Sequence, residues 1–349
     1  MGGRLGRDKL KHVPTRTPAN KIASATGLRD KIVTLRILEL PEIQRALVWT
    51  EIIDRMRDAL IANGRGECDT PMPMHLDIAP QHAEVHMKSS YRLGGKYFAL
   101  KIASTFPGNA QRGLPTGNGM MLLSCAETGA PVAFLADAGH LTDVRTAAVA
   151  AMVVRELKRE DQALGIVGTG IQARLQAQMH TEVLDLKEIW IWGRDPEHTL
   201  QCWRELQTLT PRAEVRIAGS PAEIARRTRL IVTATASRRP LLVADDVQPG
   251  THISAVGSDS PGKQELDPEI LRRASLLLVD SHRQCQSLGE LQHAPDTWGR
   301  AVEIGAFCES SLLPDPAAIT VADLTGLGVE DLYIAESVWR TISATGSPS

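Results

Sequence analysis

The segment DQALGIVGTGIQARLQAQMH, residues 161–180, contains an apolar run, a closely spaced pair of glycines and the start of a helical pattern. It predicts a strand ending at Val167, a tight turn at Gly168 and Gly170, and a helix beginning at Ile171. Gly168 permits a turn that a side chain would obstruct. Gly170 lets the backbone approach a pyrophosphate, which would lie on the free N–H groups at the start of the helix. Many glycine turns only connect a strand to a helix, but the strand before this turn and the helix after it lead us to predict dinucleotide binding.

Strand and helix patterns alternate from this segment to about residue 280. The strand candidates are Leu164–Val167, Glu188–Trp192, Glu214–Ala218, Leu230–Thr235, His252–Val256 and Leu276–Val279. This alternation is typical of an α/β fold with a doubly wound parallel sheet. A helical stretch at Gln284–His293, a proline-bearing linker and a final helix from Val329 are expected after it.

The first part of the chain has a different pattern. Residues 38–62 have helical periodicity, and residues 69–123 are strand-like, with alternation at Glu84–Tyr91. An Ala-rich helix is predicted at Leu141–Leu157, with Thr142 as its N-cap. The pattern indicates two domains, with a boundary near this helix.

Composition excludes several functional classes. The 349 residues carry a formal net charge of −2, which gives no support to nucleic-acid or membrane binding. The longest apolar run, at 147–154, is too short to cross a bilayer. Five cysteines without a C-x-x-C pair indicate reduced thiols, a cytoplasmic location and no zinc site. Residues 1–31 are basic, which is typical of a solvated arm or, alternatively, of a transit peptide.

Lys101 lies within the apolar run YFALKIA at residues 97–103. An ammonium in a buried strand is costly unless an anion pairs with it. The functional interpretation is that Lys101 binds a substrate carboxylate or protonates a nitrogen, and the alternative is a structural ion pair with a nearby acid.

Other candidate residues have two interpretations each. Arg145, near the start of a helix, is unfavourable against the helix dipole unless an anion lies there, and the alternative is a surface salt bridge. Asp259 follows a predicted central strand, where ligands bind in such sheets, but its surroundings are also ordinary turn chemistry. Lys88 shares a strand face with charged neighbours, as solvated faces do. His75 and His86 lack a spacing typical of a metal site, so no metal is predicted.

The residues after the second strand bear on cofactor choice. An acidic residue there would bind the ribose of NAD, whereas an arginine would accommodate the 2′-phosphate of NADP. Arg194 directly follows Trp192-Gly193 and Asp195 is one position late, which favours NADP(H) and leaves NAD(H) open.

Several separated motifs resemble the ornithine cyclodeaminase/mu-crystallin family of NAD(P)-dependent enzymes over residues 35–345. They are KIASTFPGN (101–109), GLPTGNGMMLL (113–123), LTDVRTAA (141–148), GTGIQARLQ (168–176), VGSDSPGKQEL (256–266), DSHRQCQSLGEL (280–291) and ADLTGLGVEDL (322–332). The stretches MPMHLD and EVHMKSSY are most similar to ectoine-utilisation members.

The resemblance implies an architecture and a set of roles. A substrate and dimerisation domain of residues 32–141 and 325–349 would flank a Rossmann-type cofactor domain of residues 142–324, and the protein would be a homodimer. Lys101 and Arg145 would bind the substrate carboxylate, and Asp259 would serve acid/base chemistry. The implied cofactor-binding set is Thr142, Gly168, Thr169, Gly170, Ile171, Gln172, Gly193, Arg194, Asp195, Thr233, Ala234, Thr235, Val256 and Gly257.

Two positions depart from the cyclodeaminase pattern. Lys88 stands where cyclodeaminases have a glutamate, and it resembles the alanine dehydrogenase branch, which has a basic residue at that place. Both branches also have a basic residue earlier in the chain, where the nearest candidates here are His75 and Asp77. We therefore expect an NAD(P)-dependent oxidoreductase that reduces a small imino acid (ketimine) to an amino acid, or the reverse. Lys88 would be both a substrate-binding and a catalytic residue, and His75 a substrate-binding residue. The alternatives are an ammonia-releasing cyclodeaminase with catalytic NAD and a non-catalytic NADP-dependent ligand-binding protein.

Overall fold

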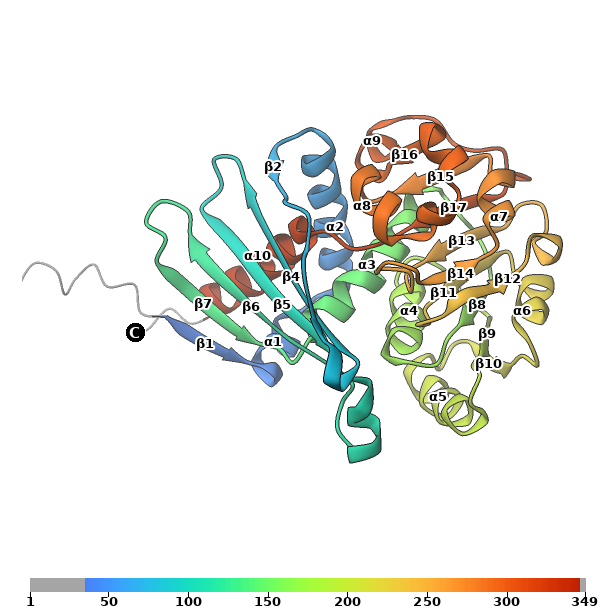
Figure 1. Cartoon of the computed structure of the whole chain (residues 1–349), viewed down its shortest axis with the longest axis horizontal. Coiled ribbons are helices and arrows are strands. Elements are labelled where there is room, and N and C mark those ends of the chain that lie inside the picture. Colours follow the sequence, from blue (N-terminus) through green and yellow to red (C-terminus); the bar gives the residue numbers. More distant parts are fainter. Residues whose placement is uncertain (1–34, 346–349) are drawn as a thin grey trace, which may run out of the picture. The chain divides into compact units, whose positions relative to one another are not determined.

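The computed structural model describes residues 35–345, so the basic arm expected at residues 1–31 lies outside the described part of the chain. The described residues form two large sheets and a small one of β12 (Arg238–Leu242) and β14 (Gln264–Leu266) (Figure 1). Both large sheets have helices packed on them.

The first sheet has seven strands in the described range, in the order β1-β7-β6-β5-β4-β2, with β3 paired to β4. Its strands are β1 (Arg36–Glu39), β2 (Cys68–Asp69), β3 (Met74–Ile78), β4 (Ala83–Arg92), β5 (Tyr97–Thr105), β6 (Gly117–Cys125) and β7 (Pro131–Ala136). Neighbouring strands are antiparallel except for the parallel pair β1 and β7.

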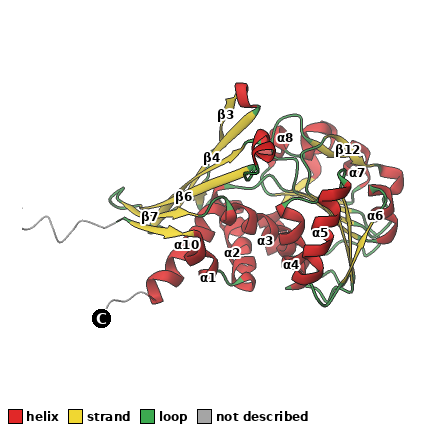
Figure 2. Cartoon of the chain, turned by 90° about the horizontal axis from the view of Figure 1, so that it is seen from below, coloured by secondary structure: helices red, strands yellow, loops and turns green. Residues whose placement is uncertain are grey.

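Four helices cover one face of this sheet (Figure 2). They are α1 (Leu40–Ala46), α2 (Trp49–Gly64), α3 (His140–Glu156) and α10 (Gly328–Thr345). On α2 the apolar positions Ile52, Ile53, Met56 and Leu60 recur at helical spacing and are all buried. The C-terminal helix α10 therefore packs on a sheet built from the N-terminal part of the chain.

The second sheet has eight parallel strands among the described residues, in the order β10-β9-β8-β11-β13-β17-β15-β16. The strands are β8 (Ala163–Val167), β9 (Glu188–Trp192), β10 (Glu214–Ile217), β11 (Leu230–Thr233), β13 (His252–Ala255), β15 (Leu276–Val279), β16 (Ala301–Glu303) and β17 (Thr320–Asp323). The helices are α4 (Ile171–Thr181), α5 (Pro196–Leu209), α6 (Pro221–Arg227), α7 (Pro268–Arg273), α8 (His282–Leu288) and α9 (Ile304–Glu309). The predicted doubly wound parallel sheet is confirmed. Its strand order reverses at β8, where such sheets bind ligands at their carboxyl ends.

Two local predictions were wrong. Helix α3 begins at His140 rather than being capped by Thr142, because the Asp137 carboxylate accepts the Leu141 N–H at 2.7 Å. The expected proline-bearing linker contains β16, α9 and the central strand β17. Their sequences, AVE, IGAFCE and TVAD, are short and lack the continuous apolar run that marks strands such as β11 and β15.

The sheets draw their strands from residues 36–136 and 163–323 respectively. The exact division of the chain into domains remains our proposal. None of the helices in the described range is long and apolar enough to span a membrane.

Candidate functional site

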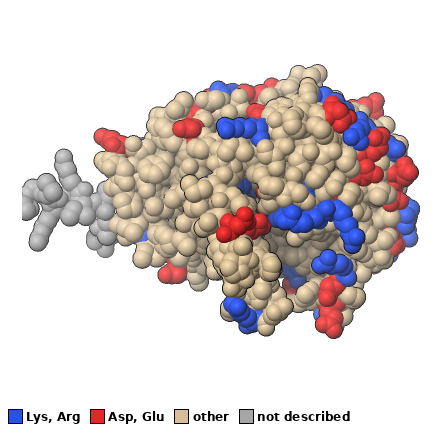
Figure 3. Space-filling view, viewed as in Figure 1, with Lys and Arg blue, Asp and Glu red and all other residues tan. Residues whose placement is uncertain are grey.

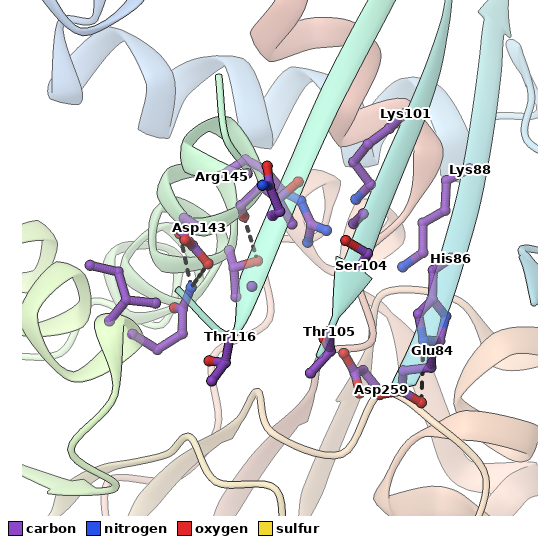
Figure 4. A pocket seen from close by; sticks show the side chains of 18 of the residues that line it. Glu84, His86, Lys88, Lys101, Ser104, Thr105, Thr116, Asp143, Arg145 and Asp259 are labelled. Atoms are coloured by element: carbon purple, nitrogen blue, oxygen red, sulfur yellow. Dashed lines mark hydrogen bonds and ion pairs between the residues drawn. The ribbon is translucent and has the colours of Figure 1, made fainter. Parts of the chain in front are cut away.

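A cavity of about 590 Å³ is lined by strands of the first sheet, by α3 and α4 and by loops of the second sheet. It brings together Lys88, Lys101, Arg145 and Asp259, which sequence reasoning singled out separately (Figure 4). In the space-filling view, basic and acidic side chains border a hollow in the surface (Figure 3). Chain segments far apart in sequence thus contribute charged groups to one site.

Lys101 is only 2% exposed, and its ammonium is 2.9 Å from an oxygen of Asp331 on α10. Burial and the nearby Arg145 guanidinium lower the pKa of Lys101 to about 7, although Asp331 acts in the opposite direction. The structure is consistent with both interpretations of Lys101. Its ion pair with Asp331 fits a structural role, and its position in the cavity lining fits a role in substrate binding.

Arg145 projects from α3 and is buried. Its Nε donates to Asp331 at 3.1 Å and its Nη1 to Glu330 at 3.0 Å. Arg145 does form salt bridges, as the alternative interpretation expected. That interpretation was wrong in placing them at the surface, because they are buried. Burial raises the pKa of Glu330 to about 7, against the influence of Arg145. Burial opposes the ionisation of Asp331, yet Lys101 and Arg145 hold the pKa of that carboxyl below its usual value.

Lys88 lies directly opposite Lys101 in the register of β4 and β5. Its ammonium donates to the carbonyl oxygens of Thr325 and Gly326, at 3.0 and 2.8 Å. Burial and the Arg145 charge lower the pKa of Lys88. Three cations consequently converge on one end of the cavity, with Asp331 and Glu330 as the acids bonded to two of them.

Asp259 follows β13 on the other side of the cavity. Its carboxylate accepts a hydrogen bond from Lys263 at 2.6 Å, and Lys263 is also 3.7 Å from Glu84. Burial would raise the pKa of Asp259, but Lys263, together with Lys88 and His86, holds it below its usual value. Asp259 is therefore an ionised carboxylate that faces the lysines.

His75 is not among the residues that line the cavity. It lies on β3 opposite His86 of β4, and the two rings are 4.6 Å apart in an edge-on arrangement. Their spacing in the sequence gave no indication of a metal site, but the pairing of β3 with β4 brings both histidines together with Glu84. Spacing along the sequence does not report cross-strand neighbours, so it could not reveal this grouping.

Sequence reasoning missed other charged residues of the site. Glu330 and Asp331 lie in the quoted motif GVEDL without an assigned role. Asp143 accepts a hydrogen bond from Gln172 at 3.3 Å, and burial raises the pKa of Asp143 to about 6. The signal that could have identified Asp331 is its place on the first turn of α10, next to a sheet that contains a buried lysine.

A second cavity, of about 340 Å³, adjoins the glycine turn between β8 and α4. Seven residues of the predicted cofactor set line it, namely Gly168, Thr169, Gly170, Gly193, Arg194, Ala234 and Thr235. Four others, Thr142, Ile171, Gln172 and Val256, line the first cavity. Asp195, Thr233 and Gly257 line neither: Asp195 caps α5, Thr233 is fully buried and Gly257 donates to Glu265.

The two glycines of the turn differ in what surrounds them. Gly168 has φ +135°, and a Cβ there would lie 2.5 Å from the Ala234 carbonyl oxygen, so the fold itself requires glycine. A Cβ on Gly170, which is the N-cap of α4, would lie in open space apart from its chain neighbours. This geometry fits a dinucleotide pyrophosphate.

Comparisons with known proteins agree with the motifs. The sequence profile of the ornithine cyclodeaminase/mu-crystallin family matches residues 35–346. A putative dehydrogenase of Rhizobium meliloti is 37% identical over 84% of this chain and 91% of its own length. An uncharacterized cyclodeaminase of Sinorhizobium fredii is 36% identical over 76% of this chain and 82% of its own.

Among solved structures, an archaeal alanine dehydrogenase dimer with bound NAD superposes with a TM-score of 0.82. It is 27% identical, and the match covers 90% of this chain and 98% of that chain. The resemblance predicted from the separated motifs is confirmed: this chain belongs to the ornithine cyclodeaminase/mu-crystallin family.

Proposed function

We propose that this protein is an NAD(P)-dependent oxidoreductase that interconverts a small α-imino acid and the corresponding amino acid. The observation that carries the proposal is the convergence of Lys88, Lys101 and Arg145 on a cavity that Ile171 and Gln172, next to the glycine turn, also line. An anionic substrate bound to these cations would lie beside the predicted position of the nicotinamide. The dehydrogenase and alanine dehydrogenase relatives support this reaction class.

In this proposal the cations hold the substrate and Lys88 moves the proton. Lys101 and Arg145 bind the α-carboxylate, with Asp331 keeping both of them in place. The bound cofactor supplies the hydride for the α-carbon, or accepts it in the reverse direction. As the C=N bond becomes a single bond, its nitrogen takes up one proton. Lys88 donates that proton, since its lowered pKa makes it a better acid than an ordinary lysine.

Asp259 has a complementary role. Its lowered pKa favours the ionised form, so it can accept a proton from the water that hydrolyses the imine. Lys263 orients its carboxylate and partly neutralises it. Lys88 therefore handles the nitrogen proton in both directions, as microscopic reversibility requires, and Asp259 is assigned to the hydrolytic water.

We infer that NADP(H) is the preferred cofactor. Arg194 lines the second cavity, where it is available to a 2′-phosphate. The Asp195 carboxylate instead accepts the His198 N–H at 2.9 Å as the cap of α5, which disfavours a role in binding the ribose of NAD. Arg194→Ala should weaken NADPH binding by about tenfold or more, equivalent to 1.4 kcal/mol, and leave NADH binding unchanged. Equal losses for both cofactors would overturn the preference.

The reaction is tested with small α-keto acids mixed with ammonia or methylamine, following oxidation of NADPH and of NADH. Net oxidation that depends on both the keto acid and the amine supports a reductase. If no combination oxidises either cofactor, the proposal fails.

A cyclodeaminase is the second candidate, because one of the relatives above carries that name. In such a reaction the hydride leaves and returns within one turnover and ammonia is lost, so there is no net consumption of NAD(P)H. Lys88 favours the reductase, since it stands where the cyclodeaminase pattern has a glutamate. Ammonia release from a diamino acid with catalytic cofactor would favour the second candidate.

We also propose a homodimer that forms through the helix-free face of the first sheet. Large apolar side chains are exposed on strands β3, β5 and β6 of that face, namely Met74, Leu76, Leu100 and Met120. Exposed apolar groups on adjacent strands are typical of an interface. The dimeric alanine dehydrogenase supports this assembly.

A further inference from the structure

The hairpin of β3 and β4 carries a second group of titratable side chains at the rim of the first cavity. In the register of the two strands His75 is opposite His86 and Asp77 is opposite Glu84. Directly opposed residues of an antiparallel pair project from the same face of the sheet. Since Glu84 and His86 line the cavity, this face is the one that carries the proposed substrate site (Figure 4).

The donor atoms of three of these side chains are close together. One ligand atom each from His75, Glu84 and His86 lies within 4.8 Å of the other two. In the part of the chain that the structure describes, no other group of three or more His, Cys, Asp or Glu side chains has this arrangement. Two imidazoles and one carboxylate form the donor set that suits Zn²⁺, whereas Mg²⁺ and Ca²⁺ prefer oxygen ligands alone.

A carboxylate already orients the His75 ring. The His75 Nε2 is 2.9 Å from an Asp77 oxygen, and the His86 Nε2 is 3.6 Å from a Glu84 oxygen. A carboxylate hydrogen-bonded to one nitrogen of a histidine is a common device for holding the ring of a metal ligand. Because β3 is an edge strand and the His75 side chain is 35% exposed, this ring can turn toward an incoming ion.

We propose that His75, Glu84 and His86 bind one Zn²⁺ ion at the rim of the cavity, with Asp77 positioning the His75 ring. The ion leaves a fourth position open to water or to a ligand in the cavity. Lys263 is the competing cation, since its ammonium is 3.7 Å from Glu84. The Lys263 ammonium is much closer to the Asp259 carboxylate, at 2.6 Å, so Lys263 keeps this ion pair when Glu84 binds the metal.

This site is independent of the proposed reaction, so it is tested by binding rather than by turnover. Tag-free full-length protein is titrated with Zn²⁺ by calorimetry, with Mg²⁺ as a second probe. We expect one equivalent of Zn²⁺ to bind and Mg²⁺ to show no binding. His75→Asn should weaken Zn²⁺ binding by more than about 100-fold, and Asp77→Asn by about tenfold.

His82→Asn is the matched control. His82 lies in the same hairpin with φ +48°, a left-handed conformation that asparagine accommodates, and it is not one of the grouped side chains. It should bind Zn²⁺ like the unmodified chain. The proposal is overturned if the unmodified chain binds no Zn²⁺, or if His75→Asn binds it as tightly as His82→Asn does. Loss of binding in Cys68→Ser or Cys125→Ser, at the two cysteines that are not buried, would also overturn it, because the ligand would then be a thiolate.

Discussion

Lys88 and Lys101 are the residues on which the proposed chemistry depends most. Like charges directly opposite each other in a sheet are destabilising, and here the pair is also buried. Asp331 is bonded to Lys101, whereas the hydrogen-bond partners of Lys88 within residues 35–345 are backbone carbonyls alone. The arrangement therefore favours the entry of an anion, which a substrate carboxylate would supply.

Replacement of Lys101 by methionine tests its role in binding the substrate. Loss of a buried charged contact costs about 3–4 kcal/mol, so kcat/KM should fall by about 100- to 1,000-fold. Cofactor affinity should stay nearly the same, and Asp331 would keep its bond to Arg145. Steady-state kinetics and a cofactor titration measure the two effects. Lys96→Met, at an exposed lysine just before β5, is the control. Undiminished turnover in Lys101→Met would contradict the assignment.

The pKa of Lys101 predicts a pH dependence of the kinetics. Because that pKa is lowered to about 7, the ammonium is present below pH 7 and is lost as the pH rises. The kcat/KM for an anionic substrate should fall by up to about tenfold for each pH unit above this value. In Lys101→Arg the charge persists at every pH, so whatever activity remains should show no such decline. An identical decline in both proteins would assign the titration to another group.

At the scale of elements, the unit of β8, the glycine turn and α4 was predicted from the sequence to within a residue or two. Its signals are local: an apolar run, two glycines and a helical pattern. The central strand β17 was missed because its sequence, TVAD, is not an apolar run, whereas the equally short strands β11 (LIVT) and β15 (LLLV) are largely apolar. Its neighbours β13 and β15 define it as a strand. Local patterns thus predict a short strand well when it is a continuous apolar run or ends at a glycine turn.

The two glycines of this turn should respond differently to alanine. Gly168→Ala forces a Cβ against the Ala234 carbonyl in a conformation unsuited to side chains, so the free energy of unfolding should fall by about 1–3 kcal/mol. Gly170→Ala should leave stability unchanged and weaken cofactor binding by about tenfold or more, or 1.4 kcal/mol. Thermal unfolding and cofactor titration separate the two effects. Tight cofactor binding by Gly170→Ala would show that no pyrophosphate lies on this turn.

At the scale of the whole molecule, the site could be predicted only in part. Lys101, Arg145 and Asp259 each carried a signal, either charge in an apolar context or position after a strand. Asp331, by contrast, is brought to Lys101 by the return of α10 to the first sheet, and no local pattern encodes that contact. The grouping of His75 with His86 required the strand register, which the sequence did not provide.

The proposed dimer is a further property of the whole molecule. Met120→Asp places a charge on the helix-free face of the first sheet, where Met120 is 39% exposed. We expect the variant to elute as a monomer, because burying an unpaired charge in an interface is costly. Light scattering after size exclusion measures the mass. Leu312→Asp, at a 76% exposed position outside this sheet, should remain dimeric. A dimeric Met120→Asp would place the interface elsewhere.

The central claim is that hydride passes between the cofactor and the α-carbon of an imino acid held by Lys88, Lys101 and Arg145. It is tested most directly by following NADPH that carries deuterium in the transferred position through reaction with a small α-keto acid and ammonia. We predict one equivalent of NADPH oxidised for each amino acid formed, with the deuterium on its α-carbon. Amino acid without deuterium, or an absence of NADPH and NADH oxidation with every imino acid tried, would contradict the claim.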